Sequence, residues 1–225
     1  MGEVPTVVHG LAGHDAATPA PVQLGPREVV EGKMFAHPDH IASDRITLCL
    51  LIRDVQRRLA GTSGPVEVWE PSPEQWYRHV IIPRPDAFKS HQRLTVVGFF
   101  GRKRDSVPLE VARAIQDLSA ELDRRIYQVP AVLSYSTHLL VDENNYANLV
   151  LMDSEDAIGT WRNIAPHPLA AGPVSRRYYA FVRIYHGAID TSQMAVEGAV
   201  RLHRVKYWDY RSDPTWTAHR ELAVV

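Results

Sequence analysis

The sequence predicts an α+β fold, because its central part alternates in the order strand, helix, strand, strand, helix, strand. This order is the split βαβ, or ferredoxin-like, arrangement. The second helix begins at Ser154, and Pro166 and Pro168 interrupt it, so we expect a broken helix or two short turns over 154–171. The four strand-like runs and the first helix lie at 94–103, 131–141, 146–152, 176–187 and 107–126.

The first helix of this unit has the clearest pattern. Its apolar residues recur with a helical period and form one stripe that suits the face of a sheet: Val111, Ala112, Ile115, Leu118, Leu122 and Ile126. In the first strand, Gly98 and Gly101 flank two phenylalanines. Glycines inside a strand often mark a bulge or a close approach of another element.

Outside this unit, an amphipathic pattern predicts a helix between Ile41 and Leu59. Two strand candidates follow at 66–70 and 76–82, separated by a proline-rich turn, and β-branched and aromatic residues favour one more strand at 199–210. We therefore predict four regions. They are a flexible N-terminal arm (1–30), an N-terminal extension packed on the core (31–90), the ferredoxin-like core (91–190) and a C-terminal strand and tail (191–225).

Composition restricts the function classes. The chain of 225 residues has a formal charge of -1, which gives no general attraction to nucleic acid or to an anionic membrane. Its single cysteine, Cys49, excludes an internal disulfide and fits a reducing compartment. No apolar run approaches the ~20 residues that span a bilayer, and no secretory signal is evident. We expect a soluble cytoplasmic protein without nucleic-acid or membrane partners.

Several catalytic motifs are absent from the sequence. It contains no GxSxG elbow, no GxGxxG fingerprint, no P-loop and no HExxH helix. His37 and His40 flank Asp39 at a spacing that is only weakly typical of a metal site. These absences argue against a serine hydrolase, a Rossmann dinucleotide site and a zinc protease.

The segment 153–187, DSEDAIGTWRNIAPHPLAAGPVSRRYYAFVRIYHG, carries a resemblance. An acidic helix start is followed by Trp161, then by His167, and then by a closing strand that ends near His186. This pattern resembles the antibiotic-biosynthesis and haem-degrading monooxygenases of the dimeric α+β barrel superfamily. The resemblance covers roughly residues 94–187, and the chain departs from it in the prolines that flank His167 and in the lack of an Asn in the first strand.

The resemblance implies a four-stranded sheet with both helices on one face, and a homodimer in which two sheets meet face to face. It also implies a cavity between each sheet and its helices, in which such proteins hold haem or an aromatic or quinone-like substrate. His167 would then be the haem ligand or an acid–base group. Trp161 would then stack on the cofactor or substrate. Arg102 belongs to the basic cluster 102–104, which either solvates a strand end or binds a carboxylate such as a haem propionate.

Strand periodicity supplies further candidates. His138 shares a strand face with Ser134 and Ser136, opposite Tyr135 and Thr137, and that face lines either the cavity or the solvent. Tyr146 and Asn148 share a face of the next strand and can donate hydrogen bonds to a substrate. Trp161 is alternatively a core residue, and His167 alternatively a structural or surface histidine.

We therefore expect a homodimeric small-molecule enzyme, a monooxygenase-like oxidoreductase that acts on an aromatic or polyketide-like substrate. Its candidate catalytic residues are His167, His138, Tyr146 and Asn148, and haem is a candidate cofactor. Two alternatives remain open at this point: a haem-dependent lyase or dehydratase, and a non-catalytic dimeric ligand-binding protein.

Overall fold

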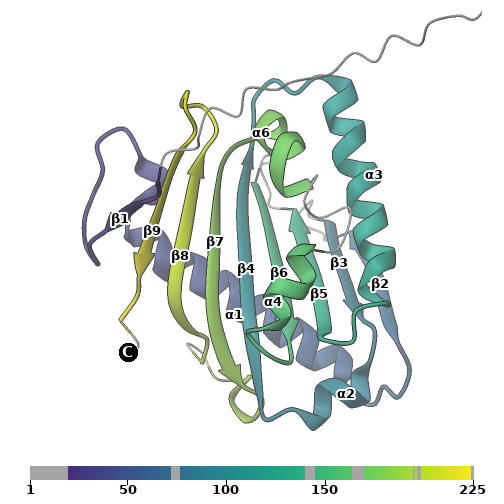
Figure 1. Cartoon of the computed structure of the whole chain (residues 1–225). Coiled ribbons are helices and arrows are strands. Elements are labelled where there is room, and N and C mark those ends of the chain that lie inside the picture. Colours follow the sequence, from purple (N-terminus) through teal and green to yellow (C-terminus); the bar gives the residue numbers. More distant parts are fainter. Residues whose placement is uncertain are drawn as a thin grey trace, which may run out of the picture.

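One large sheet organises the chain in the computed structural model (Figure 1). The structure describes residues 20–71, 77–139, 145–163, 170–194, 196 and 199–223. Within them, nine strands lie in the order β1-β9-β8-β7-β4-β6-β5-β3-β2. Only the pairing of β1 with β9 is parallel, and every other neighbouring pair is antiparallel. The strands are β1 Val22–Leu24, β2 Val66–Pro71, β3 Tyr77–Ile82, β4 Arg93–Lys103, β5 Val132–Leu139, β6 Asn145–Met152, β7 Tyr179–Asp190, β8 Arg201–Asp209 and β9 Trp216–Glu221.

Helices cover both faces of this sheet. In Figure 1, α1 runs behind the strands, whereas α3, α4 and α6 lie in front of them. The front helices stand over the half of the sheet that contains β2 to β6, so that none of the described helices lies in front of β8 and β9. The helices are α1 Asp39–Leu59, α2 Pro85–Ser90, α3 Leu109–Ile126, α4 Ala157–Asn163 and α6 Ser175–Tyr178, with short turns at Met34–Ala36, Ala170–Val174 and Thr191–Gln193.

The predicted fold class is wrong. Strands β4 to β7 and helix α3 form near the predicted positions, but they do not make a separate four-stranded βαββαβ unit. Their strands are the middle of a nine-stranded sheet, which continues on both sides through β8, β9 and β1 and through β3 and β2. In a dimeric α+β barrel one sheet face must stay free to meet a second sheet. Here α1 fills that face, so the helices do not lie on one face only.

Helix α1 packs on the sheet through a close crossing over β4. A Cβ atom at Gly98 would lie 2.8 Å from both terminal methyl carbons of Leu48 on α1, which is closer than real atoms approach. The glycine therefore makes room for the helix, as the sequence predicted for a close approach. Around it lies the largest hydrophobic core, in which Leu48, Ile52 and Val55 of α1 are fully buried.

A buried ionic cluster fixes the same helix at the centre of the sheet. The Asp44 carboxylate accepts two hydrogen bonds from the guanidinium of Arg183 on β7, at 2.7 and 3.0 Å, and a third from the Tyr185 hydroxyl at 2.7 Å. The side chains of Asp44 and Arg183 are only 7% and 11% exposed. Because such a pair leaves a costly lone charge when one partner is removed, it determines where α1 sits.

The predicted N-terminal arm includes a strand of the sheet. Arg220 on β9 is fully buried and donates hydrogen bonds to the backbone carbonyls of Gly25, Glu28 and Ala36. One side chain thereby holds the path of residues 25–36 and keeps β1 beside β9. The rest of the predicted arm, residues 1–19, lies outside the described residues. Among the described helices, none combines the length and the apolar character that crossing a membrane requires.

Replacing Asp44 with Ala should lower the free energy of unfolding by about 3 kcal/mol, because Arg183 would remain buried without its counter-ion. Urea denaturation followed by circular dichroism measures this change. Asp105→Ala is the matched control, since Asp105 is 92% exposed and contacts Arg102 only at 3.6 Å. A loss in Asp44→Ala no larger than in the control would contradict the role given to the cluster.

Candidate functional site

The predicted site residues lie in separate places. His138, with Ser134 and Ser136, points to the face that α1 covers, and all three side chains are buried. The alternation predicted for this strand is confirmed, but the face meets a helix rather than a cavity or solvent. Burial and the charge of Arg78 lower the pKa of His138 to about 4, against the opposing effect of Asp54. His138 is therefore a neutral imidazole at physiological pH.

Tyr146 and Asn148 lie on the opposite face of the sheet. The Tyr146 and Tyr178 hydroxyls are 2.7 Å apart, and the Asn148 amide donates to the Tyr135 hydroxyl at 3.4 Å. Their shared face is confirmed, and the sheet itself separates them from His138. His138, Tyr146 and Asn148 therefore do not form one catalytic site.

The candidate cofactor residues do not come together either. Trp161 on α4 is buried in a hydrophobic cluster that includes Val97 of β4, in keeping with its alternative as a core residue. Arg102 lies five residues further along β4, about 17 Å from Val97 at the usual rise of a strand, and is paired with Asp105. His167 lies outside the described residues. The described candidates therefore do not come together in one haem site.

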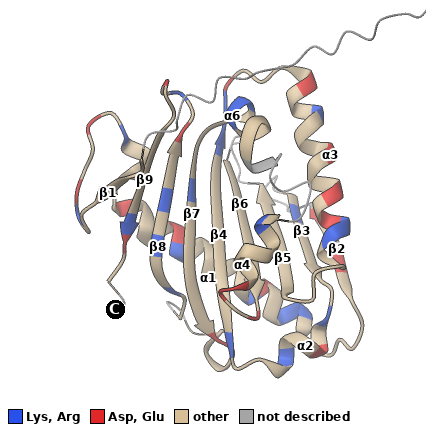
Figure 2. Ribbon diagram, in the orientation of Figure 1, with Lys and Arg blue, Asp and Glu red and all other residues tan. Residues whose placement is uncertain are grey.

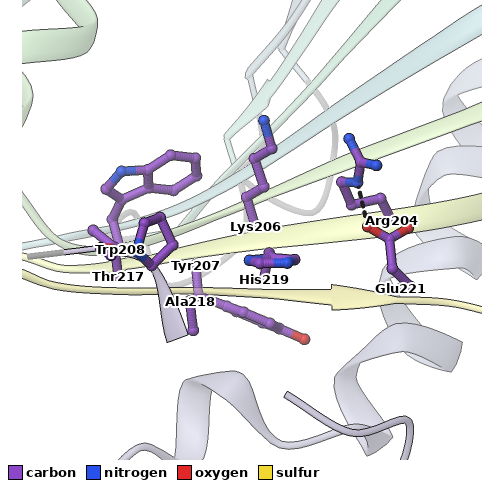
Figure 3. A pocket seen from close by; sticks show the side chains of 10 residues that line it. Arg204, Lys206, Tyr207, Trp208, Thr217, Ala218, His219 and Glu221 are labelled. Carbon is purple, nitrogen blue, oxygen red and sulfur yellow. Dashed lines mark hydrogen bonds and ion pairs between the residues drawn. The ribbon is translucent and has the colours of Figure 1, made fainter. Parts of the chain in front are cut away.

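The face of β8 and β9 that the described helices leave uncovered carries a groove of about 580 Å³. Alternate residues of the two antiparallel strands meet there in three cross-strand pairs: Arg204 with Glu221, Lys206 with His219, and Trp208 with Thr217. Ala20 and Pro21 contribute to the wall. In Figure 3 the side chains of Arg204, Lys206 and Trp208 project to one side of β8, whereas Tyr207 points to the other.

Positive charge is concentrated around this groove. Burial and the neighbouring Arg162 and Arg204 lower the pKa of Lys206, against the opposing effect of Glu221. On β7, His186 pairs with Arg204 across the strands, and its pKa is lowered to about 4 by burial and by the charges of Lys206, His203, Arg204 and Arg162. Figure 2 shows Lys and Arg positions along β8 and β9. These shifts mean that the cations lie close enough to repel one another.

The single carboxylate of the groove does not balance these charges. Glu221 accepts a hydrogen bond from Arg204 at 2.7 Å, and both side chains are nearly half exposed. Lys206 is half-buried, and no Asp or Glu among the ion pairs of the described residues is its partner. A half-buried ammonium without a paired carboxylate is stabilised when an external anion binds beside it.

The sequence contains a signal for this groove that is easily missed. From Arg204 to Asp209, polar or amphipathic residues alternate with the buried Val205 and Tyr207. Before this run the alternation is out of phase, because the pairing of β7 with β8 shifts between His186 and Gly187 and leaves His203 as an extra residue. Such a bulge reverses which residues face which side, so the segment 199–210 shows no clean faces as a whole.

Removing a neighbouring positive charge should change the titration of Lys206. Arg162→Ala and Arg204→Ala should each raise its pKa, because each removes a repulsive charge, and Glu221→Gln should lower it. Titration of ¹³C-dimethylated lysine by NMR measures the change, with Lys206→Arg to identify the signal. An unchanged Lys206 pKa in all three variants would show that these charges do not interact in the groove.

No group of three or more His, Cys, Asp or Glu suited to a metal ion occurs among the residues that the structure describes. Comparison of the chain with protein-family models, with curated proteins and with solved structures gave no significant match.

Proposed function

We propose that the chain is a small-molecule-binding protein, and that the groove over β8 and β9 takes a ligand with both an anionic group and an aromatic ring. The observation that carries the proposal is the crowding of Lys206 with Arg162 and Arg204 beside a groove that the described helices leave uncovered. Such a ligand is, in chemical terms, an aryl phosphate, a nucleotide or an aromatic carboxylate.

The anionic part follows from electrostatics. Bringing Lys206, Arg204 and Arg162 together costs free energy, because like charges repel and Lys206 is partly removed from water. A phosphate or carboxylate next to these groups attracts each of the cations and accepts charge-assisted hydrogen bonds from them, which offsets their mutual repulsion. Binding of an anion should therefore raise the pKa of Lys206, and affinity should fall as the pH rises through that pKa.

The aromatic part follows from the shape and lining of the groove. Trp208 lies next to Lys206 along one side of β8 and is half-buried, so one face of its ring is supported by the protein (Figure 3). Opposite it, Thr217 offers a hydroxyl, and His219 faces Lys206. A ring that stacks on an indole while its anionic group reaches the cations makes both contacts at once.

The monooxygenase activity and the use of haem stay predictions. The described members of the predicted catalytic set lie on two faces of the sheet, and none of them lines the groove. Ligand binding without assigned chemistry is the function that the described residues support best.

Phenyl phosphate is the probe that tests the proposal, with inorganic phosphate and benzyl alcohol as its separate halves. Isothermal calorimetry should show saturable binding of phenyl phosphate that is tighter than that of either half. Lys206→Ala should weaken it about tenfold, the loss of one charge-assisted contact. Trp208→Leu should weaken phenyl phosphate while leaving inorganic phosphate unchanged.

Arg201→Ala is the matched control, because Arg201 belongs to the same strand, is paired with Asp190 and lies outside the groove. It should bind phenyl phosphate like the unchanged protein. Equal losses of affinity in Arg201→Ala and Lys206→Ala would show that the effect comes from the net charge of the protein and not from the groove. Failure of the unchanged protein to bind phenyl phosphate at millimolar concentration would reject the groove as a site for this ligand class.

A further inference from the structure

At the opposite edge of the sheet, three titratable side chains meet between strands β2 and β3 and helix α3. The imidazole of His79 on β3 lies between two carboxylates. Its Nε2 is 3.4 Å from Oε1 of Glu67 on β2, and its Nδ1 is 3.5 Å from Oδ2 of Asp123 on α3. Only 2% of the His79 side chain is exposed, and the indole of Trp69 stacks on the ring with centroids 3.8 Å apart.

The three side chains can form both hydrogen bonds only when the cluster carries one additional proton. A neutral imidazole has one N–H and one lone pair, so it can donate to one of two ionised carboxylates, and its other nitrogen then faces a negative oxygen without a proton between them. If Asp123 is protonated, its hydroxyl donates a hydrogen bond to Nδ1 of His79, and the Nε2–H group of His79 donates a hydrogen bond to the Glu67 carboxylate. Both contacts are then hydrogen bonds, and the three elements are linked.

No Lys or Arg among the described ion pairs balances the charge of these two carboxylates. Tyr127, the residue that follows α3, donates to Glu67 at 2.8 Å, and Tyr135 on β5 is close enough for Asp123 to raise its pKa. Of the arginines at this end of α3, Arg124 and Arg125 pair with Glu121. Arg84 is bonded to the backbone carbonyls of Tyr127, Val129 and Val132. Among the described ion pairs, neither Glu67 nor Asp123 has a Lys or Arg partner.

We propose that Glu67, His79 and Asp123 form a pH-dependent latch, which holds β2 and β3 against α3 while the cluster carries its additional proton and loosens them when that proton is lost. The site of protonation is Asp123 rather than the ring. Burial lowers the pKa of His79, whereas burial and the charge of Glu67 raise the pKa of Asp123 to about 7. The latch therefore opens over the physiological range.

The sign of the effect follows from linkage. A carboxyl whose pKa is raised in the closed state binds more protons there than in the open state, so closure is favoured at low pH and weakens as the pH rises towards the raised value. From about pH 6 to about pH 8.5, a pKa near 7 for Asp123 predicts that the fraction of open molecules increases roughly tenfold.

Hydrogen exchange of the full chain tests the latch, after correction for the pH dependence of intrinsic exchange. Protection of the amides in 66–70 and 77–82 should fall roughly tenfold across that pH range, whereas protection of the amides in β8 and β9 should not. Asp123→Asn should abolish the pH dependence, because the amide donates to Nδ1 at every pH. Glu67→Gln should reduce it, since its amide can donate to Nε2 while Nδ1–H donates to ionised Asp123, and only the burial of Asp123 then still raises its pKa.

Asp117→Asn is the matched control, an exposed carboxyl on the same helix, and should behave like the unchanged protein. A pH-independent β2–β3 pair in the unchanged protein would overturn the latch. So would an equal pH dependence in Asp123→Asn, which would place the titrating group elsewhere.

Discussion

The packing of α1 across the sheet is the constraint on which the rest of the structure depends. Its Asp44 is bonded to Arg183 and Tyr185 at the centre of the sheet, and its Leu48 fits where Gly98 has no side chain. With that face filled, the sheet does not meet a second sheet as in a dimeric barrel. Any ligand of the sheet must then bind on the opposite face, and the described helices of that face leave β8 and β9 open (Figure 1).

The two ends of the sheet differ in charge, and each end has a distinct physical property as a result. At the β8–β9 end, Arg204 and Lys206 crowd one another and favour an anion. At the β2–β3 end, Glu67 and Asp123 crowd one another and favour a proton. In both places the uncompensated charge is half-buried, so that water does not fully screen it. Binding of an anionic ligand at one end and binding of a proton at the other each reduce the repulsion between like charges.

Much of the secondary structure could be predicted from the sequence, because helical stripes and strand alternation depend on local burial. The α1 pattern from Ile41 to Leu59 and the close approach at Gly98 are confirmed. The fold class was not predictable in this way, since strand order depends on long-range pairing, and β1 and β9 are three- and six-residue strands with weak patterns. The site was missed because β8 contains a bulge at His203 where it pairs with β7, so the segment 199–210 shows no clean faces as a whole, and alternation reveals a face only where the register is regular.

If the open face of β8 and β9 binds ligand while α1 occupies the other face, chemical-shift mapping of the ¹⁵N-labelled protein with phenyl phosphate will locate the ligand. We expect saturable shifts concentrated in 201–209 and 216–221, with the indole N–H of Trp208 among the largest and α1 unaffected. The largest shifts in α1 or in the β2–β3 strands, or an absence of saturable shifts, would contradict it.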